Sequence, residues 1–220
     1  TQTVFKSTDS GATWSASAAG LEGHVIEDFA FDPSAAPIVY AGTQAGFFKS
    51  TDDGATWSLG MSGIRHTYAQ ALAVDPNAPA TLYAAGVSDG RGSVSKSIDG
   101  GASWTQIGPL SQAPLANAAL AEMVVWQVVI DPTNSSRVYL ASTGGVFRSG
   151  DGGVTWAWGA TQNSGTVFWL AIDPLAPARD LAAEVARLPA GTPYVLSVLT
   201  PPREERLDPA TLTTALAALT

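Results

Sequence analysis

Apolar and polar residues alternate in short stretches that are separated by glycine, proline, asparagine and aspartate. The stretch "VIEDFAFDP" alternates with a period of two and ends at Pro33, which lacks the amide that a continuing central strand would need. Three short runs follow it, "PIVYAGT", "GFFKS" and "TWSLG", and turn-forming residues separate them. This pattern predicts four short β-strands between residues 25 and 60.

The chain repeats three phrases in a constant order. The phrase "KSTDDGATW" and its variants occupy residues 6–14, 49–57, 96–104 and 148–156. A second phrase, which ends in Asp-Pro, finishes at Pro33, Pro76, Pro132 and Pro174. A third, "VYAGT" at 39–43, recurs in altered form at 82–86 and 138–143. Together they define a module of roughly 43 to 52 residues.

Four short strands and an aromatic signature per module predict an all-β fold, a β-propeller of four-stranded antiparallel blades. About four repeats fill residues 1–174, and an atypical helix-strand-helix tail is expected over 175–220. The tail reads as a helix at 180–188, a strand at 193–199 and a helix up to 218. If that strand joined the two ends of the repeat array, a four-bladed ring would close. A partial propeller would instead leave open blade edges that favour self-association.

The polar phrase has a structural and a ligand-binding interpretation, and the structural one is favoured. Ser50 and Asp52 can accept hydrogen bonds from the free amides of a turn. Gly54 can adopt the positive φ that other residues resist. Trp57 is expected to pack between neighbouring sheets, so each turn would help to fasten a blade.

These residues match the Asp-box, or BNR repeat, Ser-x-Asp-x-Gly-x-Thr-Trp. Its aspartate and tryptophan fall on Asp9 and Trp14, Asp52 and Trp57, Asp99 and Trp104, and Asp151 and Trp156. Over about residues 1–174 the chain resembles the propellers of xyloglucan-active glycoside hydrolases, sortilin-type receptors and photosystem II assembly factors. The resemblance implies that the boxes lie on the face opposite the usual binding site. Ligand contacts are then expected from the loops between blades and between second and third strands.

Aligning the modules on Asp-Pro gives two variable columns next to each other. The first column holds Glu27, Gln70, Trp126 and Phe168, and the second holds Asp28, Ala71, Gln127 and Trp169. Variable positions on a fixed scaffold are typical of a binding rim, although the aromatic members could instead fill the core between blades. Further binding candidates are Arg65, His66, Asp89 and Arg91.

The expected function is a binding or scaffold module that recognises a protein or a glycan and needs no cofactor or metal. The alternative is a glycoside hydrolase, which needs two carboxyl groups about 5 to 10 Å apart. Asp28 and Asp89 are the candidate catalytic carboxylates, and only Asp89 matches the aspartate that xyloglucan-active relatives place after their "YAGT" strand. A sialidase would need an arginine cluster that the repeat does not supply. His24 and His66 could form at most a partial metal site.

Composition narrows the class of partner. Nineteen acidic and eleven basic residues give a net charge of −8, which argues against nucleic acid. The chain has no cysteine, so no disulfide framework or thiolate site is expected, and the redox compartment stays open. No apolar run is long enough for a membrane span. An extracytoplasmic or secreted location is the expectation.

Overall fold

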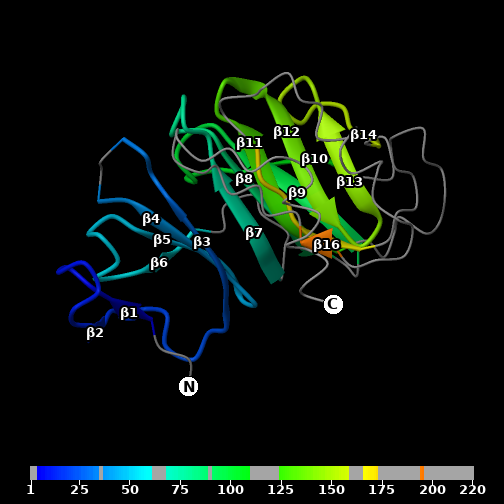
Figure 1. Ribbon diagram of the computed structural model, residues 1–220. Helices are drawn as coiled ribbons and strands as arrows, with labels where there is room; N and C mark the ends of the chain where they lie inside the picture. Colours follow the sequence, from blue (N-terminus) through cyan, green and yellow to red (C-terminus); the bar gives the residue numbers. More distant parts are fainter. Residues whose placement is uncertain are drawn as a thin grey trace, which may run out of the picture.

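A computed structural model describes residues 4–34, 37–60, 68–88, 91–109, 124–158, 166–172 and 194–195. Every helix or strand element within these ranges is a β-strand (Figure 1). No helix in this part of the chain has the length and apolar content to cross a membrane.

Three four-stranded antiparallel sheets form the body of the molecule, and each follows the chain order of its strands. The first blade consists of β3 (Ile26–Phe31), β4 (Val39–Thr43), β5 (Gly46–Ser50) and β6 (Ser58–Leu59). The second consists of β7 (Tyr68–Val74), β8 (Leu82–Ser88), β9 (Arg91–Ser97) and β10 (Thr105–Pro109). The third consists of β11 (Val125–Asp131), β12 (Asn134–Ser142), β13 (Gly145–Ser149) and β14 (Ala157–Trp158). The prediction of all-β, four-stranded antiparallel modules is confirmed.

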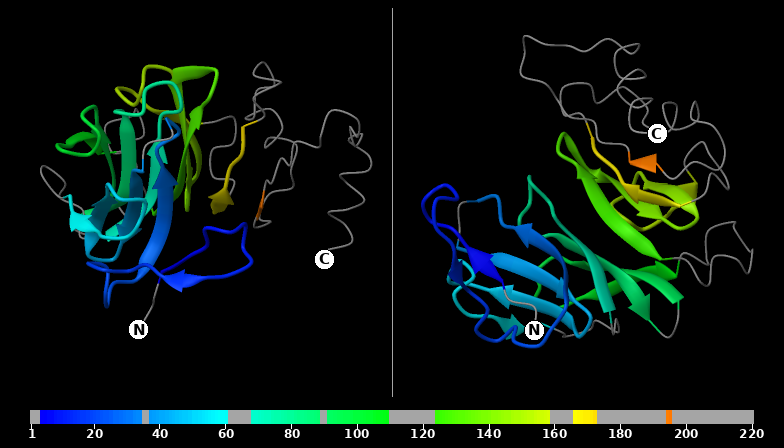
Figure 2. Two further views of the ribbon diagram at one scale, coloured as in Figure 1. Left: turned by 90° about the vertical axis from the view of Figure 1, so that its left-hand side faces the viewer. Right: turned by 60° about the horizontal axis from the view of Figure 1, so that its bottom comes forward.

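The blades follow one another along an arc, with their first strands side by side (Figures 1 and 2). β3 contacts β7, β7 contacts β11, and β11 contacts β15 (Val167–Trp169). The core therefore consists of separate layers between neighbouring blades rather than one central cluster.

A box tryptophan belongs to each layer between complete blades. Trp104 of the second blade packs with Tyr40 and Phe47 of the first, and its ring meets the Phe47 ring edge-on at a centroid distance of 4.9 Å. Trp156 packs in the same way against the second blade, beside Tyr83. Burying one indole, about 200 Å², contributes roughly 5 kcal/mol before the entropic costs of folding. The predicted packing of box tryptophans between sheets holds at Trp57, Trp104 and Trp156, which are 5% to 8% exposed.

Trp14 differs from this expectation, because its side chain is 63% exposed. It lies at the end of the hairpin formed by β1 (Phe5–Lys6) and β2 (Ser15–Ala16), which precedes the first blade. Among the described residues, no sheet covers the hairpin on the side where a preceding blade would pack. The sequence of the box is intact, so the missing neighbour explains the exposure.

The expected joining of the two ends is not found in the described residues. β1 and β2 form one two-stranded sheet, and β15 and β16 (Tyr194–Val195) form another. β15 and β16 are parallel, whereas the first two strands of each complete blade are antiparallel. The helices expected at 180–188 and up to 218 lie outside the described residues.

Candidate binding rim

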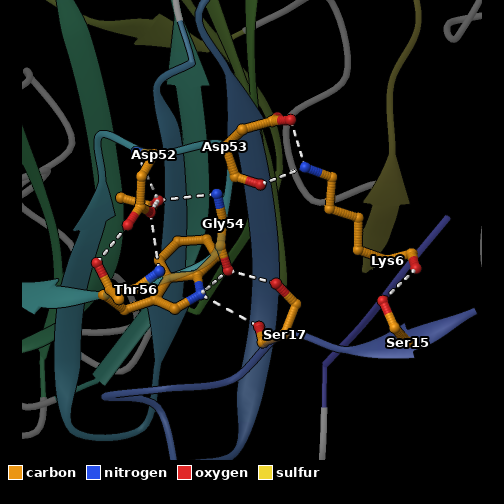
Figure 3. A network of polar contacts seen from close by, with 9 residues as sticks. Lys6, Ser15, Ser17, Asp52, Asp53, Gly54 and Thr56 are labelled. Atoms are coloured by element: carbon orange, nitrogen blue, oxygen red, sulfur yellow. Dashed lines mark hydrogen bonds and ion pairs between the residues drawn. The ribbon is translucent and has the colours of Figure 1, made fainter. Parts of the chain in front are cut away.

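The box turns, residues 7–14, 50–57, 97–104 and 149–156, share one hydrogen-bond pattern. In the second turn, the Ser50 hydroxyl donates to Asp52 Oδ1 at 2.8 Å and accepts the Gly54 amide at 2.8 Å. Thr56 donates its amide to Asp52 Oδ1 and its hydroxyl to Asp52 Oδ2 (Figure 3). The carboxylate thus closes the turn from inside, without an external ligand.

These bonds hold the pKa of all four box aspartates at about 2. The largest cause in each case is the hydroxyl that donates to the carboxylate, from Thr13, Thr56, Ser103 or Thr155. Hydrogen bonds to the charged form favour that form, so the turn is built around an ionised carboxylate.

The predicted positive φ of the box glycine is confirmed, with 84° at Gly54. The residue before it is also left-handed, since φ is 61° at Asp53. Two left-handed residues in succession turn the Asp53 carbonyl outward, where Lys6 of the preceding hairpin donates to it at 2.8 Å (Figure 3).

A contact of this kind joins each complete blade to the next, and we call it the clasp. Lys49 Nζ and the Tyr40 hydroxyl both donate to the carbonyl of Gly100, at 2.7 and 3.3 Å. Lys96 and Tyr83 donate to the carbonyl of Gly152 at 3.0 and 2.9 Å. Burial, and then nearby aspartates, raise the pKa of both tyrosines to about 12, so the phenols remain donors across the physiological range.

The opposite ends of the blades carry the variable columns. In the first blade, Thr43 pairs with Ile26 and with Gly46 at one end, while Val39 pairs with Ser50, the start of the box turn, at the other. A register shift occurs near the first of these ends in every first strand. The extra residues in these bulges are Glu27, Gln70, Trp126 and Phe168, which form the first variable column. Bulges redirect side chains and are common beside functional sites.

One half of this end is polar. Glu27 Oε1 accepts hydrogen bonds from the Tyr68 hydroxyl at 2.9 Å and from Gln44 Nε2 at 3.0 Å. Burial and the bond to Glu27 raise the pKa of Tyr68. The side chain of Gln70 also reaches the Tyr68 hydroxyl, while its Oε1 is buried and has no donor among the described residues. These groups present a fixed carboxylate beside an unsatisfied amide oxygen.

The other half is aromatic. The rings of Trp126 and Phe168 lie 5.3 Å apart between centroids and are tilted, and each side chain remains more than a third exposed. Trp169, the neighbouring residue of the second column, is 57% exposed. The three aromatic side chains are thus accessible at this end, and the interpretation as a binding rim stays a prediction. We use "rim" below for Glu27, Gln44, Tyr68, Gln70, Trp126, Phe168 and Trp169.

Two members of the second column, Asp28 and Gln127, each join their strand to the first strand of the next sheet. Asp28 Oδ2 accepts the Leu72 amide of the second blade at 2.8 Å, and its Oδ1 accepts the Phe29 amide. Gln127 Oε1 accepts the amide of Leu170 in the same way. Burial raises the pKa of Asp28 despite these two bonds. Both carboxylate oxygens of Asp28 are therefore engaged by backbone.

Most of the remaining binding candidates from the sequence cannot be located at the rim. Arg65, His66 and Asp89 lie outside the described residues, and so does the side chain of Arg91, which begins β9. His24 is half-buried, with its ring 5.0 Å from that of Phe48. No group of three potential metal ligands occurs in the described part of the chain.

Gln44 and Tyr68 were not among the sequence candidates. Gln44 lies in the loop between second and third strands, where the family resemblance expects ligand contacts, so its position was a usable signal. Tyr68 begins β7, and only the fold brings it to Glu27.

No protein-family model and no curated protein matches the chain. Several solved structures do. An ancestral GH74 enzyme is 26% identical with a TM-score of 0.56, over 69% of this chain and 20% of its own. The GH74 xyloglucanase from Xanthomonas campestris is 23% identical with a TM-score of 0.52, over 72% of this chain and 27% of its own.

The extracellular domain of BT4673 from B. thetaiotaomicron is 8% identical with a TM-score of 0.52, over 70% of this chain and 19% of its own. The fold is similar to that of β-propeller proteins. The chain spans about a fifth to a quarter of the length of these structures, so the likeness concerns the blades and not a whole enzyme.

Proposed function

We propose that this chain is a binding module that recognises a protein or a glycan through the rim. The observation that carries the proposal is the set of bulges at the end away from the box turns, where the bulged side chains of Glu27, Trp126 and Phe168 are exposed. The serine and aspartate side chains of the box turns bind within their own turns, whereas the rim carries positions that differ from blade to blade.

The chemistry of the rim suits recognition. Tryptophan offers a large contact area with little conformational freedom to lose, and it is enriched among the residues that dominate binding energy. Trp126 and Trp169 supply such surface, and Glu27 supplies an acceptor held by Gln44 and Tyr68. The tilted aromatic pair and the fixed carboxylate lie on different blades at the same end, and such groups can bind either a sugar ring with its hydroxyls or a peptide.

The test compares rim variants with a matched exposed aromatic at the box end. Phe31 is 67% exposed and lies at the other end of β3, so Phe31→Ala is the control for Trp126→Ala and Trp169→Ala. Ligands found by a glycan array and by a protein interaction screen are then titrated against all variants. Each rim variant should weaken binding by about tenfold or more, equivalent to about 1.4 kcal/mol. Equal losses for Phe31→Ala and the rim variants would refute the assignment.

A glycoside hydrolase is the second candidate, because the GH74 similarity reaches 26% identity and Asp28 has a raised pKa, as a general acid requires. Against it, both oxygens of Asp28 accept backbone amides. Hydrolysis of xyloglucan and related polysaccharides is measured for the unmodified chain, Asp28→Asn and Glu27→Gln. The binding proposal expects no turnover by any of them. Turnover that disappears in Asp28→Asn with unchanged unfolding would favour the hydrolase.

A further inference from the structure

The N-terminal hairpin exposes an aromatic face that is buried in the next blade. Phe5 and Trp14 are 58% and 63% exposed, whereas Phe48 and Trp57, at the same positions of the first blade, are buried together. Their burial partners include Leu21 from the segment before the blade. Two adjacent exposed aromatics of this kind typically mark a contact surface.

In the third blade, the cation at the clasp position has no partner among the described residues. Arg148 occupies the position of Lys6, Lys49 and Lys96, each of which binds a carbonyl of the following box turn. Its side chain is exposed and makes no hydrogen bond or ion pair with the described residues. Guanidinium is a multiple donor, so it can bind the same carbonyl as the lysines.

We propose that a second copy of this chain docks head to tail, with its N-terminal hairpin beside β15 of the first copy. Arg148 of the first copy then donates to the carbonyl of Ser10 in the second, and Phe5 and Trp14 are buried in the contact. The acceptor has the required shape, because Ser10 and Gly11 have φ of 58° and 88°, against 61° and 84° at Asp53 and Gly54. The contact repeats a junction that the chain already forms between its own blades.

The surface beside β15, which would receive the second copy, resembles the surface of the second blade that receives Trp156. Trp156 packs beside Ala85 and Val94, a cross-strand pair of the second blade, together with residues of β11. The equivalent pair of the third blade, Ala141 and Val146, packs with Val167 and Leu170 of the β15 segment. β15 thus takes the part of β11, and the indole of Trp14 would lie next to it as Trp156 lies next to β11.

A second copy fits better than the chain's own hairpin. The hairpin is fixed to the first blade through Lys6 and Asp53, and through the Ser17 hydroxyl, which donates to Gly54 O at 2.6 Å. It forms no pairing with β15 or β16, and the two ends of the arc lie apart in Figure 2. A contact between different surfaces of identical chains leaves one such surface free at each end of the pair until a ring closes, so the assembly grows with concentration.

The test exploits the absence of cysteine from the chain. Ser10→Cys and Arg148→Cys proteins, which retain Phe5 and Trp14, are mixed at high concentration and treated with a short bismaleimide that replaces the Arg148 hydrogen bond as the link between copies. The calibrating control is the double variant Lys6→Cys and Asp53→Cys, whose positions are equivalent and whose contact is present within one chain. The mixture should give a covalent dimer, and a single chain carrying both Ser10→Cys and Arg148→Cys should give cross-linked oligomers of two or more chains.

Two outcomes would overturn the proposal. If the control cross-links and the mixture does not, the two surfaces do not meet. If the double variant gives only an internally cross-linked monomer, the chain closes on itself.

Sedimentation velocity provides an independent measurement. The mass of the unmodified chain should rise with concentration, and Arg148→Glu or Trp14→Ser should keep it monomeric. Phe31→Ser, which removes an equally exposed aromatic elsewhere, should not change the association. A chain that stays monomeric at all concentrations, or loses association equally in Phe31→Ser, would refute the head-to-tail contact.

Discussion

Lys49 and Gly100 belong to consecutive blades, and a 2.7 Å hydrogen bond joins the ammonium of the first to the carbonyl of the second. The Tyr40 hydroxyl shares this acceptor at 3.3 Å, and the Lys49 ammonium lies 5.5 Å from the centre of the Tyr40 ring. Two donors from one blade therefore converge on one oxygen of its neighbour. The arrangement makes the junction resistant to the loss of either donor alone.

The two donors of the clasp, Lys49 and Tyr40, should contribute non-additively to the free energy of unfolding in a double-mutant cycle. Lys49→Met and Tyr40→Phe each leave one donor on the Gly100 carbonyl, so each should reduce the free energy of unfolding by only about 1 kcal/mol. The double variant leaves the carbonyl without either donor and should lose about 1 kcal/mol more than the sum. Urea unfolding of the dilute monomer measures these values, with Arg148→Met as the control, expected within about 0.5 kcal/mol. Strict additivity would contradict the shared-acceptor account.

The free energy of unfolding lost on replacing a box tryptophan should depend on how deeply its neighbours bury it. Trp104→Ala removes a side chain that is 5% exposed and should cost about 3 to 5 kcal/mol. Trp14→Ala removes a side chain that is 63% exposed and should cost under about 1 kcal/mol in the dilute monomer. Chemical denaturation followed by circular dichroism compares the two. Similar losses would mean that Trp14 is covered in solution.

Acid should loosen the box turns in a defined window. The pKa of Asp52 is about 2 in the fold against a usual value of 3.8, so its stabilising effect is complete above pH 3.8 and disappears as the pH falls through 2. Asp52→Asn should therefore lower the urea midpoint at pH 7, and the difference from the unmodified chain should shrink between pH 4 and 2.

Asp9→Asn is the matched control for this titration. It removes the same titrating group from a turn whose tryptophan is exposed, so its effect at pH 7 should be smaller. A deficit of Asp52→Asn that persists unchanged at pH 2 would exclude the carboxylate as the source of the stabilisation.

Replacing Gly54 or Gly86 by alanine should destabilise the fold, but for different reasons. Gly54 has a φ of 84° and its added Cβ would lie 3.6 Å from the Trp57 ring, so Gly54→Ala should cost about 1 to 2 kcal/mol through backbone strain alone. At Gly86 the added Cβ would lie 1.8 Å from the Tyr68 carbonyl oxygen, so β7 must move. Gly86→Ala should cost about 3 kcal/mol. Thermal unfolding ranks the two, and a milder Gly86→Ala would contradict the close approach of β7.

Most of the blade could be predicted because its information is local. Alternation, Asp-Pro and the glycine of the box determine strands and turns within a few residues, and the structure has these elements where the sequence indicates them. The exposure of Trp14 could not be predicted in this way, because an intact box specifies its own turn but not the sheet beside it.

The column that forms the candidate rim could be found from the sequence, but its structural role could not. Alignment on Asp-Pro found Glu27, Gln70 and Trp126 as one column, yet it could not reveal that each is the extra residue of a bulge. A bulge depends on how two strands pair, and the sequence of one strand alone does not determine that pairing. The recurrence of Lys49 and Tyr40 at fixed places in successive modules was visible, but their common acceptor lies about 50 to 60 residues away.

The order of donor and acceptor at these junctions gives the repeat a direction. At the two junctions between complete blades, the earlier blade offers a cation and a phenol and receives an indole in return. A gene that gains or loses one whole module keeps every surviving junction chemically matched, whereas a breakpoint inside a module separates a cation from its carbonyl. Duplication and deletion by complete blades are thus the length changes that this architecture tolerates.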